Sequence, residues 1–496
     1  MKKILIVLII LVAVQFGCTK LDTVLYDRVP PTDYVADPVL LMSPIYAPMR
    51  DFLDWSGWWF ANEITGDGAV GPTRGQDWDD GGKWRSLHQH TWDNNTEAVN
   101  SMWSRYYNGV IEANKFIEAQ SALGDALPVK IAIAKAKVLR AYYYYLLIDN
   151  YKDVPYETRY EFADETPSRN FRQDIFAKIT KDIEDEAPII PASTTKTGVT
   201  KGFAYSVLAR IYLNAEVYTG SPQWAKAEQY ADSVILLGQY SLDSNPLKPF
   251  LTDNSTSTEN IFVIPYDEDN YQGFNLHMRT LHYNSNLTFD MTAGPWNGFA
   301  AMYDHYNSYE DGDARKAGYF LVGQQYASDG SPINDQGAGG EPLIFDPFIP
   351  AINMDASYTA VQIRMSGARV SKFEIKKGAK DNLSNDFPLF RYADVLMMKA
   401  ESMIRQGKNG DQYINPIRSR AGVAPFSNAT LDDVLAERGR EFFWEAHRRS
   451  DLIRFGKFNQ AWWEKGVSSP DRNTFPIPQW AIDSNPKLAE PPVAIQ

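Results

Sequence analysis

Apolar residues recur every three to four positions along much of this chain, the spacing that places them on one face of an α-helix. Between 95 and 120 the pattern includes Val99, Met102 and Val110. A second helix is predicted from about 127 to 150, ending before Pro155, because proline disfavours helical backbone in the residue before it. Further helices are predicted over 171–187, 201–219, 222–238, 388–406, 410–421, 430–447 and 449–465. The predicted fold class is therefore mostly α.

Two neighbouring predicted helices combine small residues with aromatic ones. They carry Gly202-Phe-Ala-Tyr-Ser-Val-Leu-Ala-Arg-Ile-Tyr212 and Trp224-Ala-Lys-Ala-Glu-Gln-Tyr230. Alanines let paired helices approach closely, as they do in tetratricopeptide-like hairpins. Because the sequence shows no strict 34-residue period, an ordinary pair of amphipathic helices joined by a turn remains an alternative.

The helical pattern breaks in two regions, 55–94 and 239–387, which are rich in Gly, Asn, Asp, Ser and Tyr. A helical scaffold would then occupy about 95–238 and 388–465. Loops carried by a rigid scaffold are where binding residues concentrate. We therefore expect one domain over 33–496, with an irregular, loop-rich ligand-binding face that contains few short strands.

Tryptophan is concentrated at the start of this irregular part, where seven of the thirteen lie between Trp55 and Trp103. A flat amphipathic ring can stack on the C–H face of a sugar while its N–H donates a hydrogen bond. The second irregular region holds further rings, Tyr271, Phe274, Tyr283, Trp296 and Phe299. Single rings can instead fasten loops to the scaffold, but as a group they favour a stacking platform.

Patterns for catalysis, metals and cofactors are weak. Gly66–Gly71 matches GxGxxG, but no βαβ unit surrounds it, so we interpret it as a turn. His88 and His90 lack further metal ligands at the required spacing. Asp77, Asp79 and Asp80 leave calcium possible without completing a known loop. No cofactor or metal is predicted.

Glu437, Glu441 and Glu445 lie four residues apart on one predicted helix. Two such carboxylates could serve a glycosidase as acid and base. Arginines are interleaved with them, however, and Glu445 stands four residues before Arg449, a favourable ion-pair spacing. We interpret the glutamates as part of an ion-pair network.

The N-terminus predicts export. Lys2 and Lys3 precede eleven apolar residues, a run too short to span a membrane as a helix but typical of a signal peptide. Cys18 follows Gly17 and is the only cysteine, which predicts a signal over 1–17, lipidation of Cys18 and a tether over 18–32. Removing two lysines takes the formal charge from -13 to -15, which argues against nucleic-acid binding.

Several segments together resemble the SusD/RagB family of outer-membrane nutrient-binding lipoproteins. They are Arg140-Ala-Tyr-Tyr-Tyr-Tyr-Leu-Leu with Tyr151-Lys-Asp-Val-Pro155, Phe387-Pro-Leu-Phe-Arg-Tyr-Ala-Asp-Val-Leu-Met-Met-Lys-Ala-Glu401, the helix from Glu437 to Arg454, and Phe475-Pro-Ile-Pro478. The resemblance implies a SusD-like fold with four tetratricopeptide-like helix pairs. It also implies a lipid anchor in the outer membrane, facing the cell exterior.

The same resemblance implies a non-catalytic protein that captures an oligosaccharide for a SusC-like TonB-dependent transporter. Alternatives are a tetratricopeptide-type scaffold for protein partners and a helical glycosidase. By placement along the family pattern, the expected ligand-binding residues are Asp67, Arg74, Trp78, Trp84, Tyr283 and Trp296.

Overall fold

The computed structural model describes residues 41–55, 57–160 and 166–495. The predicted signal peptide, Cys18 and the tether lie outside the described residues. Residues 42–496 form one compact unit. No helix within the described ranges combines the length and the apolar character needed to cross a membrane.

Helices dominate this unit, so the prediction of a mostly helical chain is confirmed. The longer ones are α3 (Ser43–Arg50), α6 (Glu97–Ser121), α7 (Leu127–Tyr151), α8 (Arg172–Glu186), α9 (Lys201–Leu213), α11 (Trp224–Leu236), α17 (Tyr392–Arg405), α18 (Asp411–Ala421) and α19 (Leu431–Glu441).

Local chemistry sets where several of these helices begin. The Thr200 side chain accepts a hydrogen bond from the Phe203 N–H at the start of α9. Thr430 and Asp433 form a reciprocal capping box at the start of α19. Such caps satisfy backbone donors that a first helical turn leaves without partners.

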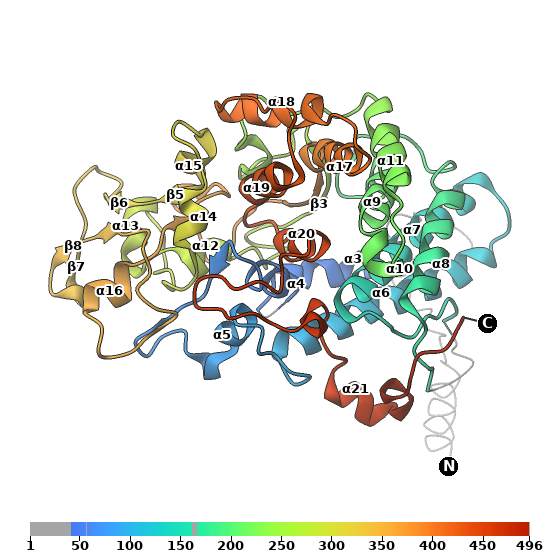
Figure 1. Cartoon of the computed structure of the whole chain (residues 1–496), viewed down its shortest axis with the longest axis horizontal. Helices are drawn as coiled ribbons and strands as arrows, with labels where there is room; N and C mark the ends of the chain where they lie inside the picture. The colour runs from blue at the N-terminus through green and yellow to red at the C-terminus, as the bar shows by residue number, and fades with distance from the viewer. Residues whose placement is uncertain (1–40, 56, 161–165, 496) are drawn as a thin grey trace, which may run out of the picture. The chain divides into compact units, whose positions relative to one another are not determined.

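The helices pack in sequence order, as Figure 1 shows from α6 to α20 (Arg448–Arg454). The packed pairs are α6 with α7, α9 with α11, α17 with α18, and α19 with α20, while α8 packs on α7 and α9. Small residues make the contacts close, since Ala204, Ala227 and Ala231 are fully buried. A Cβ on Gly109 of α6 would lie 2.3 Å from the Tyr143 ring of α7.

Three helix predictions extend too far. Residues 388–391 belong to the strand β12 (Phe387–Arg391), which pairs antiparallel with β3 (Asn260–Ile264), and both strands are fully buried. A short apolar run fits a buried strand as well as a helix, and periodicity alone does not separate the two.

The helices predicted over 430–447 and 449–465 also end early. Helix α19 stops at Glu441, and the following turn has positive φ angles at Trp444 and Ala446. Helix α20 stops at Arg454, two residues before Gly456, whose φ is +66°. Glycine adopts this left-handed conformation without a steric cost, and it commonly follows a helix end.

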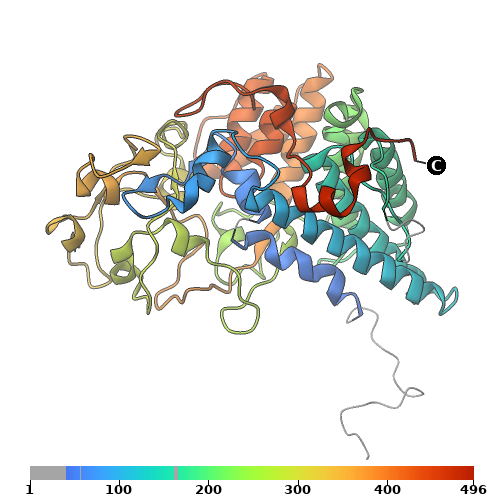
Figure 2. The ribbon, with the colours of Figure 1, turned by 90° about the horizontal axis from the view of Figure 1, so that it is seen from below.

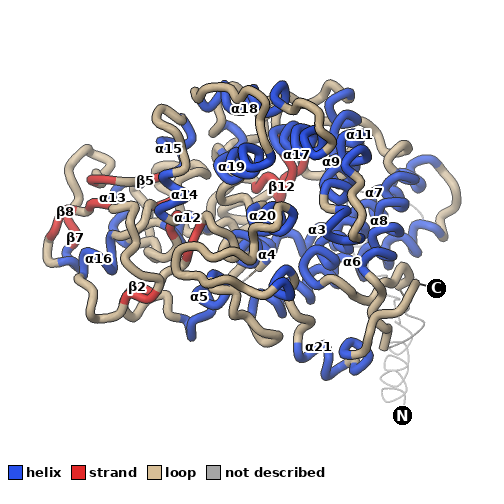
Figure 3. The backbone as a smooth tube through the Cα atoms, in the orientation of Figure 1, coloured by secondary structure: helices blue, strands red, loops and turns tan. Residues whose placement is uncertain are grey.

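The two irregular regions contain short strands, short helices and turns. The paired strands are β1 (Ala69–Val70) with β4 (Ala300–Ala301), β2 (Thr73–Arg74) with β10 (Asn353–Met354), β5 (Phe320–Leu321) with β11 (Arg369–Val370), β6 (Gly323–Gln324) with β9 (Ile344–Phe345), and β7 (Asn334–Asp335) with β8 (Glu341–Pro342). Figures 2 and 3 show these elements gathered at one end of the unit and the long helices at the other. The predicted loop-rich face is therefore a separate region beside the scaffold.

Candidate functional site

Three tryptophans of the first irregular region and one of the second form an aromatic cluster. The ring of Trp55 lies 5.6 Å from that of Trp78, 5.2 Å from that of Trp84 and 6.1 Å from that of Trp296, centroid to centroid. Trp84 is 0% exposed and Trp78 is 8% exposed, whereas Trp55 and Trp296 are half-buried. The cluster therefore brings together three of the six predicted site residues.

The indole N–H groups of the two buried rings are used inside the protein. Trp84 Nε1 donates to Asp80 Oδ2 at 2.6 Å, and Trp78 Nε1 donates to the carbonyl of Trp296 at 2.7 Å. Neither ring offers a free face to a ligand in this arrangement. These two rings fasten the loops together, which is the alternative to a stacking platform.

Arg74 is also buried. It donates from Nε to the carbonyl of Gly298 at 3.0 Å, and from its two terminal nitrogens to the carbonyls of Ile363 and Ser366 at 2.9 and 3.0 Å. Burial lowers the pKa of Arg74 to about 10. Arg74 thus joins three loop segments, and its side chain lies away from the surface.

Tyr283 connects the two irregular regions. Its hydroxyl donates to the Asp77 carboxylate, and the Arg364 guanidinium lies 4.7 Å from its ring centroid. Burial, together with Asp77, raises the pKa of Tyr283 to about 12. Arg364 in turn binds the buried Asp335 with Nε and Nη2 at 2.5 and 2.8 Å. Tyr283 is half-buried and lies at a junction that is rich in hydrogen bonds.

Asp67, the remaining predicted residue, lines a cavity of about 230 Å³. The other lining residues come from helix α14 (Tyr303–Asn307) and its flanks, from α19, from α20 and from the segment after α20. They are Met302, Asp304, His305, Ser308, Ala436, Gly439, Arg448 and Trp462. The cavity thus combines an apolar wall, an indole ring and charged groups. Such a mixture is typical of small-ligand sites.

An ion pair forms the charged wall of this cavity. Arg448 donates from Nε to Asp67 Oδ1 at 2.5 Å and from Nη2 to Oδ2 at 2.9 Å. Burial raises the pKa of Asp67, but Arg448 outweighs it and holds this pKa below its usual range. Asp67 therefore remains ionised, and its oxygens retain lone pairs that can accept from sugar hydroxyls.

Trp462 contributes its ring to the cavity lining. Among the described residues, its buried Nε1 has no hydrogen-bond partner. The Lys465 ammonium lies 3.9 Å from the indole centroid. A buried indole N–H without a partner is costly, so a ligand hydroxyl that accepts from it would gain binding energy.

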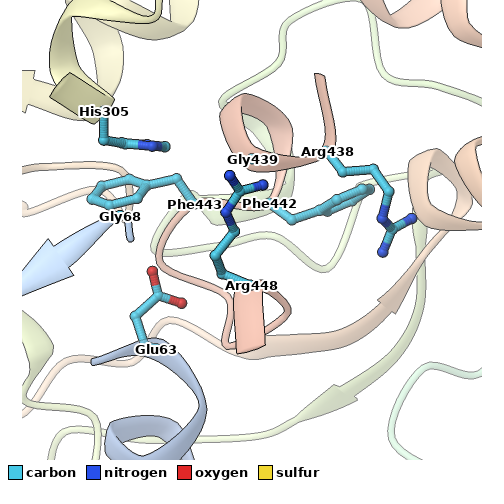
Figure 4. A pocket seen from close by; sticks show the side chains of 8 residues that line it. All are labelled: Glu63, Gly68, His305, Arg438, Gly439, Phe442, Phe443 and Arg448. Carbon is cyan, nitrogen blue, oxygen red and sulfur yellow. The ribbon is translucent and has the colours of Figure 1, made fainter. Parts of the chain in front are cut away.

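His305 belongs to this cavity and to a smaller pocket beside it, which Figure 4 shows with Glu63, Phe443 and Arg448. The imidazole stacks on Phe443 with centroids 4.4 Å apart. Burial, followed by the nearby Arg448, lowers the pKa of His305 to about 3. His305 is therefore neutral at physiological pH and leaves the cavity's charge to Asp67, Asp304 and Arg448.

The glutamates that a glycosidase would need are buried away from this cavity. Glu441 is 0% exposed and accepts from Arg315, Arg391 and Arg420 at 2.9, 3.0 and 2.5 Å. Glu437 and Glu445 are held in the same way by arginines and Lys372. The predicted ion-pair network is confirmed, but the predicted pair of Glu445 with Arg449 is wrong. The helix ends at Glu441, so Glu445 binds Lys372 and Arg391 instead, and Arg449 lies 3.5 Å from Asp149.

The two histidines considered as metal ligands bind other groups. His88 Nε2 lies 2.8 Å from the carbonyl of Trp463, while His90 lies 3.0 Å from Ser468 Oγ and 2.9 Å from the carbonyl of Thr65. Within the described ranges, no three His, Cys, Asp or Glu side chains gather where they could share a metal ion.

Sequence reasoning missed most of this cavity. Asp304 and Met302 carry no local signal beyond their irregular region, and Arg448 was assigned to the ion-pair helix. Trp462 was placed in a predicted helix that ends eight residues earlier. The adjacent pair Trp462-Trp463 was the one available signal, because two large rings side by side in a polar segment resemble the earlier tryptophan set.

Two family models match this chain. One is described as the SusD family and matches residues 258–493, and the other is described as starch-binding associating with outer membrane and matches residues 73–213. The chain is 24% identical to the starch-binding protein SusD of Bacteroides thetaiotaomicron over 440 residues, which cover 81% of this chain and 79% of that protein.

Solved structures share the fold. A SusD superfamily protein from Parabacteroides distasonis aligns with a TM-score of 0.75 at 18% identity, covering 93% of this chain and 99% of that one. Surface glycan-binding protein A from Bacteroides thetaiotaomicron, in complex with laminarihexaose, aligns with a TM-score of 0.70 at 20% identity, covering 90% and 97%. These likenesses confirm the predicted fold class, and two of the three proteins are named for binding starch or glycan.

Proposed function

This chain belongs to the SusD family, and from that premise we propose that it captures an oligosaccharide without cleaving it and delivers it to a SusC-like TonB-dependent transporter. The cavity beside Arg448 is the observation that carries the binding role. It joins both irregular regions to the C-terminal part of the scaffold, and its lining supplies acceptors, donors and a ring.

The chemistry of the cavity suits a sugar. Asp67 and Asp304 accept from hydroxyl groups, Arg448 donates, and Met302 and the Trp462 ring provide apolar walls. A sugar ring presents hydroxyls around its edge and C–H groups on its faces, so it matches such a mixed lining. None of these groups forms a pair of free carboxylates, which supports binding without hydrolysis.

Neutral glucans are the first ligands to test. The named relative binds starch and the structural neighbour binds laminarihexaose, and both ligands are glucose polymers. The cavity lining agrees with a neutral ligand, since Arg448 is already paired with Asp67 and Asp304 adds a negative charge. The negative charges of a sulfated or uronic-acid glycan would be repelled by the Asp304 carboxylate, because the one cation of the described lining, Arg448, is already paired.

We extend the proposal to the membrane. The family description names association with the outer membrane, and lipidation of Cys18 would supply the anchor, with the loop-rich face toward the exterior. Replacing Cys18 with alanine should release the exported protein into the soluble fraction of the host cell. Retention of that variant in the outer membrane would reject the lipid anchor.

Titration calorimetry of the protein from Thr19 onward tests the binding role. We expect one class of neutral glucan, an α- or β-linked oligosaccharide of six units, to bind, and no new reducing ends to appear over hours. Cleavage would reject the non-catalytic role, and silence across neutral, sulfated and uronic glycans would reject glycan capture. Transporter delivery is tested separately, by co-purification with a SusC-like barrel expressed from the same host.

A further inference from the structure

A second and larger cavity adjoins helix α14. Its volume is about 630 Å³, and its lining comes from α14, from α15 (Ala314–Tyr319) and from strands β5 and β6. The first cavity uses Asp304 and His305 of α14, whereas this one uses Tyr306. The short helix α14 therefore contributes side chains to both cavities.

The second cavity has an apolar floor. Phe320 is buried, Leu321 and Val322 are half-buried, and Ala314 and Ala317 of α15 are exposed along one wall. Tyr306 packs edge to face against Phe320 with centroids 5.3 Å apart. Aliphatic and aromatic surface of this kind can cover the C–H face of a sugar ring.

Polar groups surround that floor. The Gln324 side chain donates to the carbonyls of Gln325 and Ile333 at 2.8 and 3.2 Å, which fixes its amide and leaves the amide oxygen as an acceptor. Lys316 Nζ lies 4.8 Å from the Tyr306 ring centroid and 3.3 Å from the carbonyl of Tyr309. The contact with the Tyr309 carbonyl uses one of the three donors of the ammonium.

The one acidic residue of the lining is already neutralised. Asp313 is 3% exposed and binds Arg315, which donates from Nε to Oδ1 at 3.0 Å and from Nη2 to Oδ2 at 2.8 Å. The second cavity therefore offers mainly an ammonium and amides, whereas the first offers carboxylates. Both can bind hydroxyl groups, because a hydroxyl donates as well as accepts.

We propose that this cavity is a second carbohydrate site, which takes a further stretch of the same neutral glycan that the first cavity binds. This inference rests on the proposed function for the class of ligand and adds a site of its own. A volume of about 630 Å³ falls within the usual range of small-ligand pockets, about 300–1,000 Å³. With one site in each cavity, the protein holds a long glycan at two points and short oligosaccharides at two independent sites.

A matched pair of variants tests the second site. Ala317 of α15 lines the second cavity and Ala436 of α19 lines the first, and both are exposed alanines on helices. Ala317→Trp and Ala436→Trp each place a large ring in one cavity with no buried residue replaced. Circular dichroism and thermal unfolding confirm that both variants fold.

Calorimetry with the glucan hexasaccharide then counts the sites. The wild type should bind two molecules per chain, each single variant one, and the double variant none.

For the long polysaccharide, Ala317→Trp should weaken apparent affinity about tenfold or more, because linked sites gain from effective concentration. A stoichiometry of one in the wild type, unchanged by Ala317→Trp and lost in Ala436→Trp, would overturn the second site and leave the proposed function intact. Absence of binding to the wild type would overturn both.

Discussion

Buried arginines are held in two different ways in the two parts of this molecule. In the helical scaffold, Arg391 binds Glu259, Glu441 and Glu445 and is 1% exposed. In the loop-rich region, Arg74 is 3% exposed and donates to three backbone carbonyls. Arg391 is thus balanced by opposite charges, whereas Arg74 fastens backbone. Arg315 of the second irregular region is the exception, since it binds Asp313 and the scaffold glutamates Glu437 and Glu441.

The contrast extends to neighbouring residues. Arg369 donates to the carbonyls of Arg364, Ser366 and Gly367 and to the Asn297 side chain, and it is fully buried. Burial lowers the pKa of Arg369 well below its ordinary value, whereas the carboxylates around Arg391 outweigh burial and raise its pKa. An irregular chain has many carbonyls without ladder partners, and a guanidinium with five donors can satisfy several at once.

The difference assigns separate roles to the two regions. A network of paired charges fixes the mutual positions of β12, α18 and α19 strongly, because removing either partner leaves a buried charge uncompensated. Arginine–carbonyl contacts hold the loops in one shape and leave an exposed carboxylate such as Asp304 for other partners, whereas Asp67 is paired with Arg448. The scaffold supplies rigidity and the loop-rich region supplies the site.

Glu441→Gln should have the largest effect. The carboxylate accepts from three buried guanidinium groups, so its neutral replacement leaves excess positive charge in the core. We expect the free energy of unfolding to fall by about 3–5 kcal/mol, measured by urea denaturation at pH 7. A loss below about 1 kcal/mol would show that the network carries little of the scaffold's stability.

Glu63 of the first irregular region tests, through pH, its contact with the turn that follows α19. The carboxylate accepts from the N–H groups of Trp444 and Ala446 at 2.8 Å each. Burial raises the pKa of Glu63 to about 7, although these N–H groups and Lys372 oppose the shift. The folded protein therefore favours the protonated carboxyl, a stabilisation that is complete below about pH 4.5 and is lost as the pH rises through about 7.

A comparison with Glu63→Gln isolates this effect. From pH 4.5 to pH 8, the unfolding free energy of the wild type should fall by about 3 kcal/mol relative to that of the variant, from a shift of about 2.5 units at 1.36 kcal/mol each. The substitution also removes one of the two side-chain oxygens that accept from backbone N–H groups, which lowers the stability of the variant equally at every pH. Parallel stability profiles for the two proteins would contradict the raised pKa.

Arg74→Met should cost less than Arg391→Met. The first leaves three carbonyls without a donor but no unpaired carboxylate, so we expect a loss of about 1–3 kcal/mol. Arg391→Met leaves three buried glutamates without this partner, so the free energy of unfolding should fall as much as in Glu441→Gln. Chemical denaturation of both variants under one condition measures the difference directly, and equal losses would remove the distinction between the two regions.

The sequence predicted the scaffold well because helical periodicity is a local property. The helices from α6 to α11 begin and end within a few residues of their predicted bounds, apart from a break at Asn214. The end of α19 could not be predicted in this way. Its turn depends on Glu63, which lies 381 residues earlier than Trp444, the residue whose N–H it binds.

The candidate site was harder to predict for the same reason. Tryptophan density correctly marked the first irregular region as unusual, but it did not distinguish the buried rings of Trp78 and Trp84 from a ring beside a cavity. Asp67 was chosen, yet its partner Arg448 lies far along the chain, on a helix assigned wholly to the scaffold. Which rings are covered depends on contacts between distant segments, and a single sequence does not contain that information in readable form.

Trp462→Phe should have the smallest effect and tests the wall of the first cavity that follows α20. The phenyl ring keeps most of the packing but removes the indole N–H, which has no acceptor among the described residues. Because the wild-type donor is unsatisfied, its removal should leave the unfolding free energy unchanged or slightly higher. If a glycan hydroxyl accepts from this N–H, its loss should weaken glycan binding by about 1 kcal/mol, which is about fivefold in Kd.

Trp480→Phe on α21 (Gln479–Ser484) provides the matched control, because the ring is 47% exposed and lines none of the cavities described above. Equal glycan affinities for these two variants would place the sugar away from Trp462, whereas a loss confined to Trp462→Phe would identify an unsatisfied donor of the folded protein as a ligand contact.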